Sequence, residues 1–227
     1  MMDIQLNYKE KGSGFPLILL HGNDEDHTYF VHQTEYFSMQ YRVIALDTRG
    51  HGASPRGEAP FSLWQFAEDL REFMDEQRIE KAHILGFSDG GNIGLCFALK
   101  YPERIEKLIV DGANLFLEGL KPFVKNPIVD AYQRASFQAG ESADAKREAE
   151  MLGLMVNDPN IDPAELKKLS MPVLVMAGTD DMIEESHTQL ICDSIPDARL
   201  VWIQGDHFIA NKCPVEFNRA VDAFLQK

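Results

Sequence analysis

One stretch of the chain gives the clearest structural signal: Ala82-His83-Ile84-Leu85-Gly86-Phe87-Ser88-Asp89-Gly90-Gly91. Its first four residues predict a buried strand, and the largely apolar residues that follow, up to Lys100, predict a helix. The glycines on either side of Ser88 fit a sharp strand-to-helix turn, in which larger side chains would collide with the backbone. The stretch therefore predicts a Ser88 hydroxyl that is pushed outward near the positive end of a helix dipole.

Further apolar runs recur along the chain, at residues 16–20, 43–46, 108–110, 173–177 and 200–203. Most are continuous rather than alternating, which is typical of parallel strands covered on both faces. Helical stretches lie between them, the clearest of which begins at Ser62, with Gln65 completing a capping box and Phe66 and Leu70 at helical spacing. The alternation predicts an α/β fold with a doubly wound, mostly parallel sheet, whose functional residues follow the strands.

The amino-terminal segment has its own pattern. Ile4, Leu6 and Tyr8 alternate with polar residues, and Lys11 to Gly14 then turn the chain into the run at residues 16–20. We interpret this segment as a β-hairpin.

One segment interrupts the alternation of strands and helices. Between about Leu115 and Leu169 no strong strand pattern occurs, and Asp162-Pro163-Ala164-Glu165 predicts a helix start. We therefore expect residues 1–114 and 170–227 to form an α/β core and residues 115–169 to form a small helical lid.

Composition and charge limit the partners. The formal net charge of −14 opposes binding to nucleic acid and to anionic membranes, and favours a small-molecule partner. Met1 to Gly14 mixes charged and polar residues, so no signal peptide is expected, and the run at 16–20 is far shorter than the roughly 20 residues of a membrane span. The three widely spaced cysteines fit a reducing cytoplasm. The sequence leaves the oligomeric state open.

A serine hydroxyl becomes a good nucleophile only when a base takes its proton. Of the seven histidines, His207 is the candidate, because it follows the last predicted strand in Gln204-Gly205-Asp206-His207-Phe208. His21 and His51 are expected to hold loops by hydrogen bonds. The other four have no motif around them and are expected to have surface or packing roles: His27, His32, His83 and His187.

An acid that orients the histidine should follow the penultimate strand, where Gly178-Thr179-Asp180-Asp181 offers two adjacent candidates. Acyl transfer also needs donors for an oxyanion, and we expect these to be the backbone N–H groups of Asn23, after the first core strand, and of Asp89. No spacing of residues suggests a metal site.

Together these motifs resemble the α/β-hydrolase superfamily, over nearly the whole chain from Ile4 to Phe224. The landmarks are, in order, residues 21–22, 47–54, 86–90, 178–181 and 205–208. The D-x-R-G-x-G-x-S pattern at 47–54 is similar to that of cofactor-independent, lipase- or esterase-like members. Residues 86–91, 100–102 and 111–114 further resemble the valacyclovir-hydrolase-like branch.

The resemblance implies roles for individual residues. In that superfamily the acid commonly lies three residues after the glycine, which favours Asp181 over Asp180. The short amino-terminal region implies that the first strand of the family is missing. Within the lid, four aromatic residues are candidate walls of the substrate pocket: Phe116, Phe123, Tyr132 and Phe137. The carboxylate of Asp89 is a candidate contact for a substrate amine, with helix capping or pairing with a loop as the alternative.

The resemblance also implies an activity. We expect a serine hydrolase without cofactor that cleaves a small carboxylic ester, or an amide or amino-acid ester, through an acyl-enzyme. Superfamily members with an aspartate nucleophile are disfavoured, because Ser88 occupies that position. The alternatives are a C–C bond hydrolase, a cofactor-free peroxidase and a non-catalytic ligand-binding homologue, since fold does not fix function.

Overall fold

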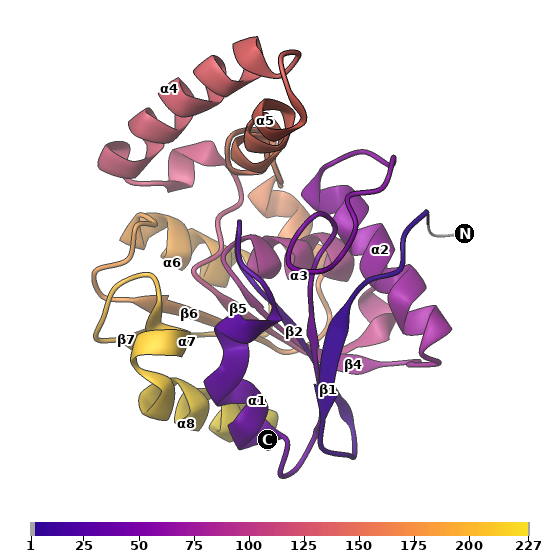
Figure 1. Cartoon of the computed structure of the whole chain (residues 1–227). Helices are drawn as coiled ribbons and strands as arrows, with labels where there is room; N and C mark the ends of the chain where they lie inside the picture. Colours follow the sequence, from indigo (N-terminus) through magenta and orange to yellow (C-terminus); the bar gives the residue numbers. More distant parts are fainter. Residues whose placement is uncertain (1–2, 227) are drawn as a thin grey trace.

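A seven-stranded sheet runs through the middle of the computed structural model, which describes residues 3–226 (Figure 1). The strand order is β1-β3-β2-β4-β5-β6-β7. Only β1 is antiparallel to its neighbour among these described strands, and the others are parallel. The strands are β1 (Tyr8–Lys11), β2 (Pro16–Leu20), β3 (Arg42–Leu46), β4 (Ala82–Phe87), β5 (Ile105–Asp111), β6 (Val173–Gly178) and β7 (Ala198–Ile203). The predicted fold class is confirmed.

Helices cover both faces of the sheet (Figure 1). One face is covered by α1 (Val31–Phe37), α7 (Ile209–Lys212) and α8 (Pro214–Leu225), and the other by α2 (Leu63–Glu76), α3 (Asp89–Lys100) and α6 (Glu185–Ser194). The remaining helices are α4 (Pro122–Gln138), α5 (Ala143–Asn157) and the short 3₁₀ helices η1 (His27–Phe30), η2 (Pro102–Arg104), η3 (Leu117–Gly119) and η4 (Pro163–Lys168).

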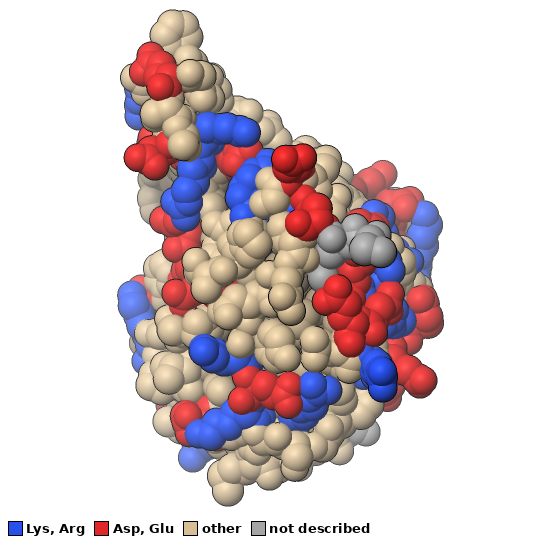
Figure 2. Space-filling model, turned by 45° about the vertical axis from the view of Figure 1, so that its right-hand side comes forward, with Lys and Arg blue, Asp and Glu red and all other residues tan. Residues whose placement is uncertain are grey.

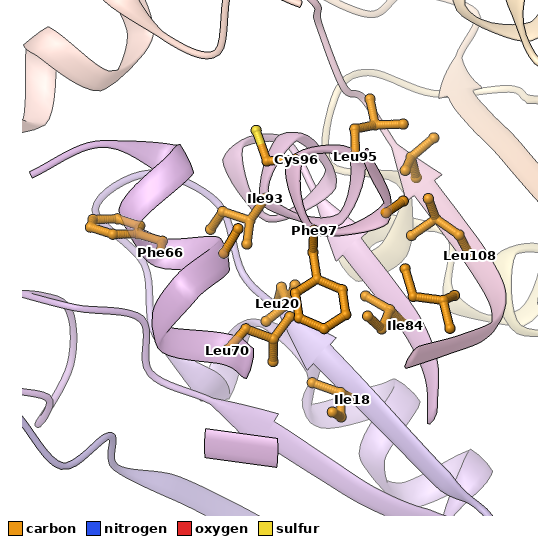
Figure 3. Packing of buried hydrophobic residues seen from close by; sticks show 14 of the residues in the cluster. Ile18, Leu20, Phe66, Leu70, Ile84, Ile93, Leu95, Cys96, Phe97 and Leu108 are labelled. Atoms are coloured by element: carbon orange, nitrogen blue, oxygen red, sulfur yellow. The ribbon is translucent and has the colours of Figure 1, made fainter. Parts of the chain in front are cut away.

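The apolar side chains of each strand divide between two cores, because successive residues point to opposite faces. In β2, Ile18 and Leu20 belong to the core under α2 and α3, whereas Leu17 and Leu19 belong to the core under α1 and α8. Figure 3 shows Phe97 of α3 among the side chains of the first core. Continuous apolar strands are therefore explained by burial on both faces.

The amino-terminal segment does not form the predicted hairpin. β1 pairs with β3, with Tyr8 opposite Leu46, and β2 lies on the other side of β3. The connecting loop instead packs closely on residues 38–41: Gly12 has φ +83°, and a Cβ there would lie 2.3 Å from the carbonyl oxygen of Ser38. Of the alternating residues only Tyr8 lies in β1, so the pattern marks the approach to the strand and does not identify its partner.

Helices α4 and α5 lie in the segment for which the sequence predicts a lid, and they stand away from the sheet at the top of the molecule (Figure 1). α5 is tied to the core by ion pairs of Glu150 with Arg56 (2.7 Å) and of Arg147 with Asp24 (2.9 Å). The helix start predicted at Asp162 is a six-residue 3₁₀ helix, η4, in which the Asp162 carboxylate accepts the backbone N–H of Ala164.

Charged side chains of both signs are interspersed on the face shown in Figure 2. Within residues 3–226 no helix has both the length and the apolar sequence that a membrane crossing requires.

Candidate active site

Ser88 occupies the turn between β4 and α3, at φ +52° and ψ −119°. A positive φ is strained for a residue with a side chain and is retained only where the surroundings enforce it. The surroundings are backbone: a Cβ at Gly90 would lie 1.9 Å from the carbonyl oxygen of Leu20, and one at Gly86 would lie 2.1 Å from the carbonyl oxygen of Gly90. The two glycines therefore allow the turn, which leaves Ser88 partly exposed at the start of α3.

The candidate base and acid meet in a buried pair. Nδ1 of His207 lies 2.7 Å from Oδ1 of Asp181, and the two residues are 4 % and 2 % exposed. The same carboxylate accepts the backbone N–H groups of Ile183 (3.0 Å) and Gly178 (3.4 Å), which fix its orientation. A carboxylate at Nδ1 holds the proton there and leaves Nε2 unprotonated. Asp180, the competing candidate, is exposed.

The backbone beside Ser88 also contacts the His207–Asp181 pair. The N–H of Ser88 donates to the carbonyl oxygen of Asp111 (2.8 Å), the last residue of β5. The next residue is Gly112, at φ +61°, where a Cβ would lie 2.6 Å from Cε1 of His207. The imidazole is therefore held between the end of β5 and the ring of Phe87, whose centroid lies 4.8 Å from its own.

The loop after β2 holds Asn23, the predicted oxyanion residue. His21 is buried and accepts the backbone N–H of Thr48 at Nε2 (3.0 Å), as its predicted structural role requires. The N–H of Gly22 donates to Glu25 (3.0 Å). The side-chain amide of Asn23 donates to the carboxylate of Asp89 (2.9 Å) and to the carbonyl oxygen of Met151 in α5 (3.1 Å). The structure thus brings Asn23 and Asp89 together and ties both to α5.

Three carboxyl groups in this region have raised pKa values. Burial raises the pKa of Asp89 to about 6, against the lowering effect of the Asn23 amide, and the charge of Asp158 raises it further. Burial likewise raises the pKa of Glu25 to about 7 and that of Asp158 to about 6. Sequence reasoning misses Glu25 and Asp158, because the property that sets them apart is burial, and neither lies in a recognised motif.

The four aromatic residues predicted as pocket walls are not brought together. Phe123 and Phe137 of α4 are 72 % and 88 % exposed. Phe116 packs edge-on against His187, with ring centroids 4.7 Å apart. Tyr132 lines a cavity of about 390 Å³ and accepts a hydrogen bond from Asn157 (2.9 Å).

A different cavity, of about 480 Å³, lies beside Asn23. Its apolar lining comes from the two helices of the segment for which the sequence predicts a lid: Ala131 of α4 and Met151, Leu152 and Met155 of α5.

One cluster of described residues has its donor atoms within 4.8 Å of one another, as a metal site requires: Asp26, His27 and Asp47. The oxygens of Asp47 already accept the N–H of Ala53 (2.9 Å) and the N–H of His27 (2.8 Å), and Oδ1 lies 2.7 Å from Nδ1 of His27. These bonds explain the cluster as a tie between the loops that follow β2 and β3.

Comparison with known proteins places this geometry in a family. Residues 16–150 match the model of the family described as alpha/beta hydrolase fold. 3-Oxoadipate enol-lactonase 2 of Acinetobacter baylyi is 27 % identical, over 99 % of this chain and 94 % of the relative. Human serine hydrolase BPHL is 28 % identical, over 98 % of this chain and 84 % of the relative. The crystal structure of a hydrolase from Pseudomonas aeruginosa PA01 superposes with a TM-score of 0.82 at 27 % identity, over 99 % of this chain and 95 % of that chain. The chain therefore belongs to the α/β hydrolase fold family of enzymes.

Proposed function

We propose that the chain is a serine hydrolase that cleaves a small carboxylic ester, or an amide, through an acyl-enzyme. The observation that carries the proposal is the buried His207–Asp181 pair, packed on the backbone that also binds the N–H of Ser88. Such a pair supplies an oriented base next to a hydroxyl whose turn forces it outward.

In the first half of the reaction, the Ser88 hydroxyl attacks the substrate carbonyl carbon while Nε2 of His207 takes its proton. The carboxylate of Asp181 stabilises the resulting imidazolium. The backbone N–H groups of Asn23 and Asp89 donate to the oxyanion of the tetrahedral intermediate. The imidazolium then protonates the leaving group, whose bond to carbon breaks, and the acyl-enzyme remains.

In the second half, water attacks the acyl carbonyl carbon and gives a proton to His207. The bond to Ser88 breaks, the serine oxygen takes that proton back, and the carboxylic acid leaves. The enol lactone in the name of the Acinetobacter relative is a cyclic carboxylic ester, which supports ester cleavage as the first activity to test.

The proposal is tested by incubation with a fluorophosphonate, which reacts with activated serines, followed by peptide mass analysis. We expect the label on Ser88 of the folded protein and none after denaturation. A panel of p-nitrophenyl esters, anilides and lactones then separates ester, amide and lactone cleavage. A folded protein that is neither labelled nor active on any of these would favour a non-catalytic ligand-binding role.

We further propose that residues 115–169 act as a lid whose α5 side chains contact the substrate. Replacing Met155 with alanine is expected to shift kcat/KM toward longer acyl chains, by about fourfold for each added methylene that fills the vacated space. Phe137→Ala is the matched control, because that side chain is 88 % exposed on the same lid. Unchanged chain-length preference in Met155→Ala, or an equal change in the control, would contradict this part of the proposal.

Within the same function we propose that the carboxylate of Asp89 attracts a cationic substrate group. Because the pKa of Asp89 is about 6, its negative charge develops as pH rises through that value. The preference for an α-amino ester over its uncharged isostere, measured as a ratio of kcat/KM, should therefore be larger at about pH 7 than at about pH 5, since most of the amine is protonated at both values. Desolvation of both charges offsets part of the attraction, so a modest ratio is expected.

Asp89→Asn should abolish both the preference and its pH dependence, and Asp193→Asn, at an exposed position on α6, should leave them in place. A preference that survives Asp89→Asn would assign the carboxylate to its observed bond with Asn23 alone.

A further inference from the structure

Asp111, the last residue of β5, is a carboxyl group that the proposed mechanism does not use. It is fully buried, and neither of its carboxyl oxygens has a hydrogen-bond partner within the described residues. Buried polar groups are nearly always paired, so an aspartate in this state is an exception that calls for a reason.

The surroundings of Asp111 are apolar. It directly follows the apolar run at residues 108–110 of β5 and lies between Phe87 of β4 and Met176 of β6 in the sheet register. Tyr29 stacks on Phe87, the register neighbour of Asp111, and its hydroxyl is also buried without a partner among the described residues. Burial raises the pKa of Tyr29 far above its usual range, and the nearby carboxyl of Asp111 adds to this effect. An ionised carboxylate is disfavoured in such an environment.

The backbone at Asp111 contacts both Ser88 and the His207–Asp181 pair of the candidate triad. Its carbonyl oxygen accepts the N–H of Ser88, and its neighbour Gly112 packs on the imidazole: a Cβ there would lie 2.9 Å from Nδ1 of His207 and 3.6 Å from Oδ2 of Asp181. Since consecutive Cα atoms are about 3.8 Å apart, the Cα of Asp111 lies within roughly 8 Å of Nδ1. The side chain of Asp111 lies on the same face of the sheet as that of Phe87, its register neighbour, and the Phe87 ring centroid is 4.8 Å from that of His207. A charge on this side of the sheet would act on the imidazole through a medium that excludes water.

The protonation of Asp111 depends on Asp181. Burial raises the pKa of Asp111 well above its usual range, and the negative charge of Asp181 raises it further. Two neighbouring carboxyls in an apolar site do not both ionise readily. Removing the charge of Asp181 therefore lowers the pKa of Asp111, so that its carboxyl group ionises more readily.

We propose that Asp111 is a reserve carboxylate of the active site: it stays protonated while Asp181 is ionised, and it takes over part of the stabilisation of the His207 imidazolium when the Asp181 charge is removed. Its proton then goes to bulk water, and the proton of the Ser88 hydroxyl still moves to Nε2 of His207. The inference rests on the proposed serine hydrolase function.

A double-mutant cycle with Asp111→Asn and Asp181→Asn tests the proposal. The readout is the second-order rate of labelling of Ser88 by a fluorophosphonate. Asparagine has nearly the shape of a protonated aspartate, so the fold should be kept, and circular dichroism checks this. We expect Asp111→Asn to slow labelling by at least about ten times more in the Asp181→Asn background than in the wild type. If Asp111→Asn slowed labelling by the same factor in both backgrounds, Asp111 would be a structural residue and the proposal would be overturned.

A control cycle and a pH profile complete the test. The control is a second cycle in which Asp180→Asn replaces Asp111→Asn. Because Asp180 is exposed, its substitution should change the labelling rate by the same factor in both backgrounds. The pH profile of labelling in Asp181→Asn alone should contain an ionisation step, from Asp111 beside His207 and Tyr29, that the wild type lacks.

This profile needs no substitution at position 111, so it decides the question even if Asp111→Asn does not fold: a profile of wild-type shape overturns the proposal. Failure of the proposed function itself would look different, because Ser88→Ala would then be labelled at the wild-type rate.

Discussion

Replacing Ser88 with alanine is expected to lower kcat/KM for p-nitrophenyl acetate by about 10⁴-fold or more. The alanine methyl group has no proton to give to His207 and no oxygen to form the acyl bond, so only binding and oxyanion stabilisation remain. The fold should survive, because the Ser88 backbone makes the bonds that hold the turn, to Asp111 and to Asn92. The measurement is the initial rate in a preparation free of contaminating esterases, with the loss of fluorophosphonate labelling as a second readout.

Ser136→Ala is the matched control for Ser88→Ala, because Ser136 is an exposed serine on α4. It should keep wild-type turnover and labelling. Wild-type turnover in Ser88→Ala would reject Ser88 as the nucleophile, whatever the geometry of the turn.

The fold of this chain can be predicted because its strongest signals are local. Gly86 and Gly90 permit the close backbone approach that the turn requires, and continuous apolar runs mark strands that are covered on both faces. Strand partners are a long-range property. The pairing of β1 with β3 accompanies the packing of Gly12 on residues 38–41, which the alternation in residues 4–8 does not encode, and the hairpin prediction fails for this reason.

The three candidate catalytic residues are visible in the sequence for a topological reason. Each follows a strand, and the carboxyl ends of parallel strands meet at one edge of the sheet. The residues alone leave open which of the two adjacent aspartates is the acid. In the structure it is Asp181 whose carboxylate lies against His207. Asp111 has one usable signal, a carboxyl group that directly follows the apolar run at residues 108–110, but its lack of partners depends on residues distant in the sequence.

The segment proposed as a lid, residues 115–169, is the part of the structure that the sequence predicts least well. Phe123 and Phe137 have the residue type of a pocket wall, but α4 packs on α5 at the outside of the molecule and leaves both exposed (Figure 1). Residue type predicts burial only where the helix has a neighbour on that face. Most of the apolar side chains that line the cavity beside Asn23 belong to α5, whose methionines carry no motif.

Asp181→Asn is expected to lower kcat/KM by about 10²- to 10⁴-fold, whereas Asp180→Asn should change it by about twofold at most. Oδ1 of Asp181 accepts both His207 and the N–H of Ile183, so an asparagine is best accommodated with its amide oxygen at that position. The histidine then keeps its place, but the negative charge that stabilises the imidazolium is lost. Asp180 is an exposed matched control, and its own contact is a backbone bond to Gly205 (2.9 Å), which asparagine retains.

Parallel kinetics of the two variants, with circular dichroism melts to confirm folding, decide between the adjacent aspartates. A larger loss in Asp180→Asn would reverse the assignment of the acid. A loss in Asp181→Asn at the lower end of the range is what a reserve carboxylate at Asp111 implies, because part of the charge stabilisation is then replaced. A loss as large as that of Ser88→Ala would indicate that the triad depends on Asp181 alone, since no other group would then stabilise the imidazolium in the absence of its charge.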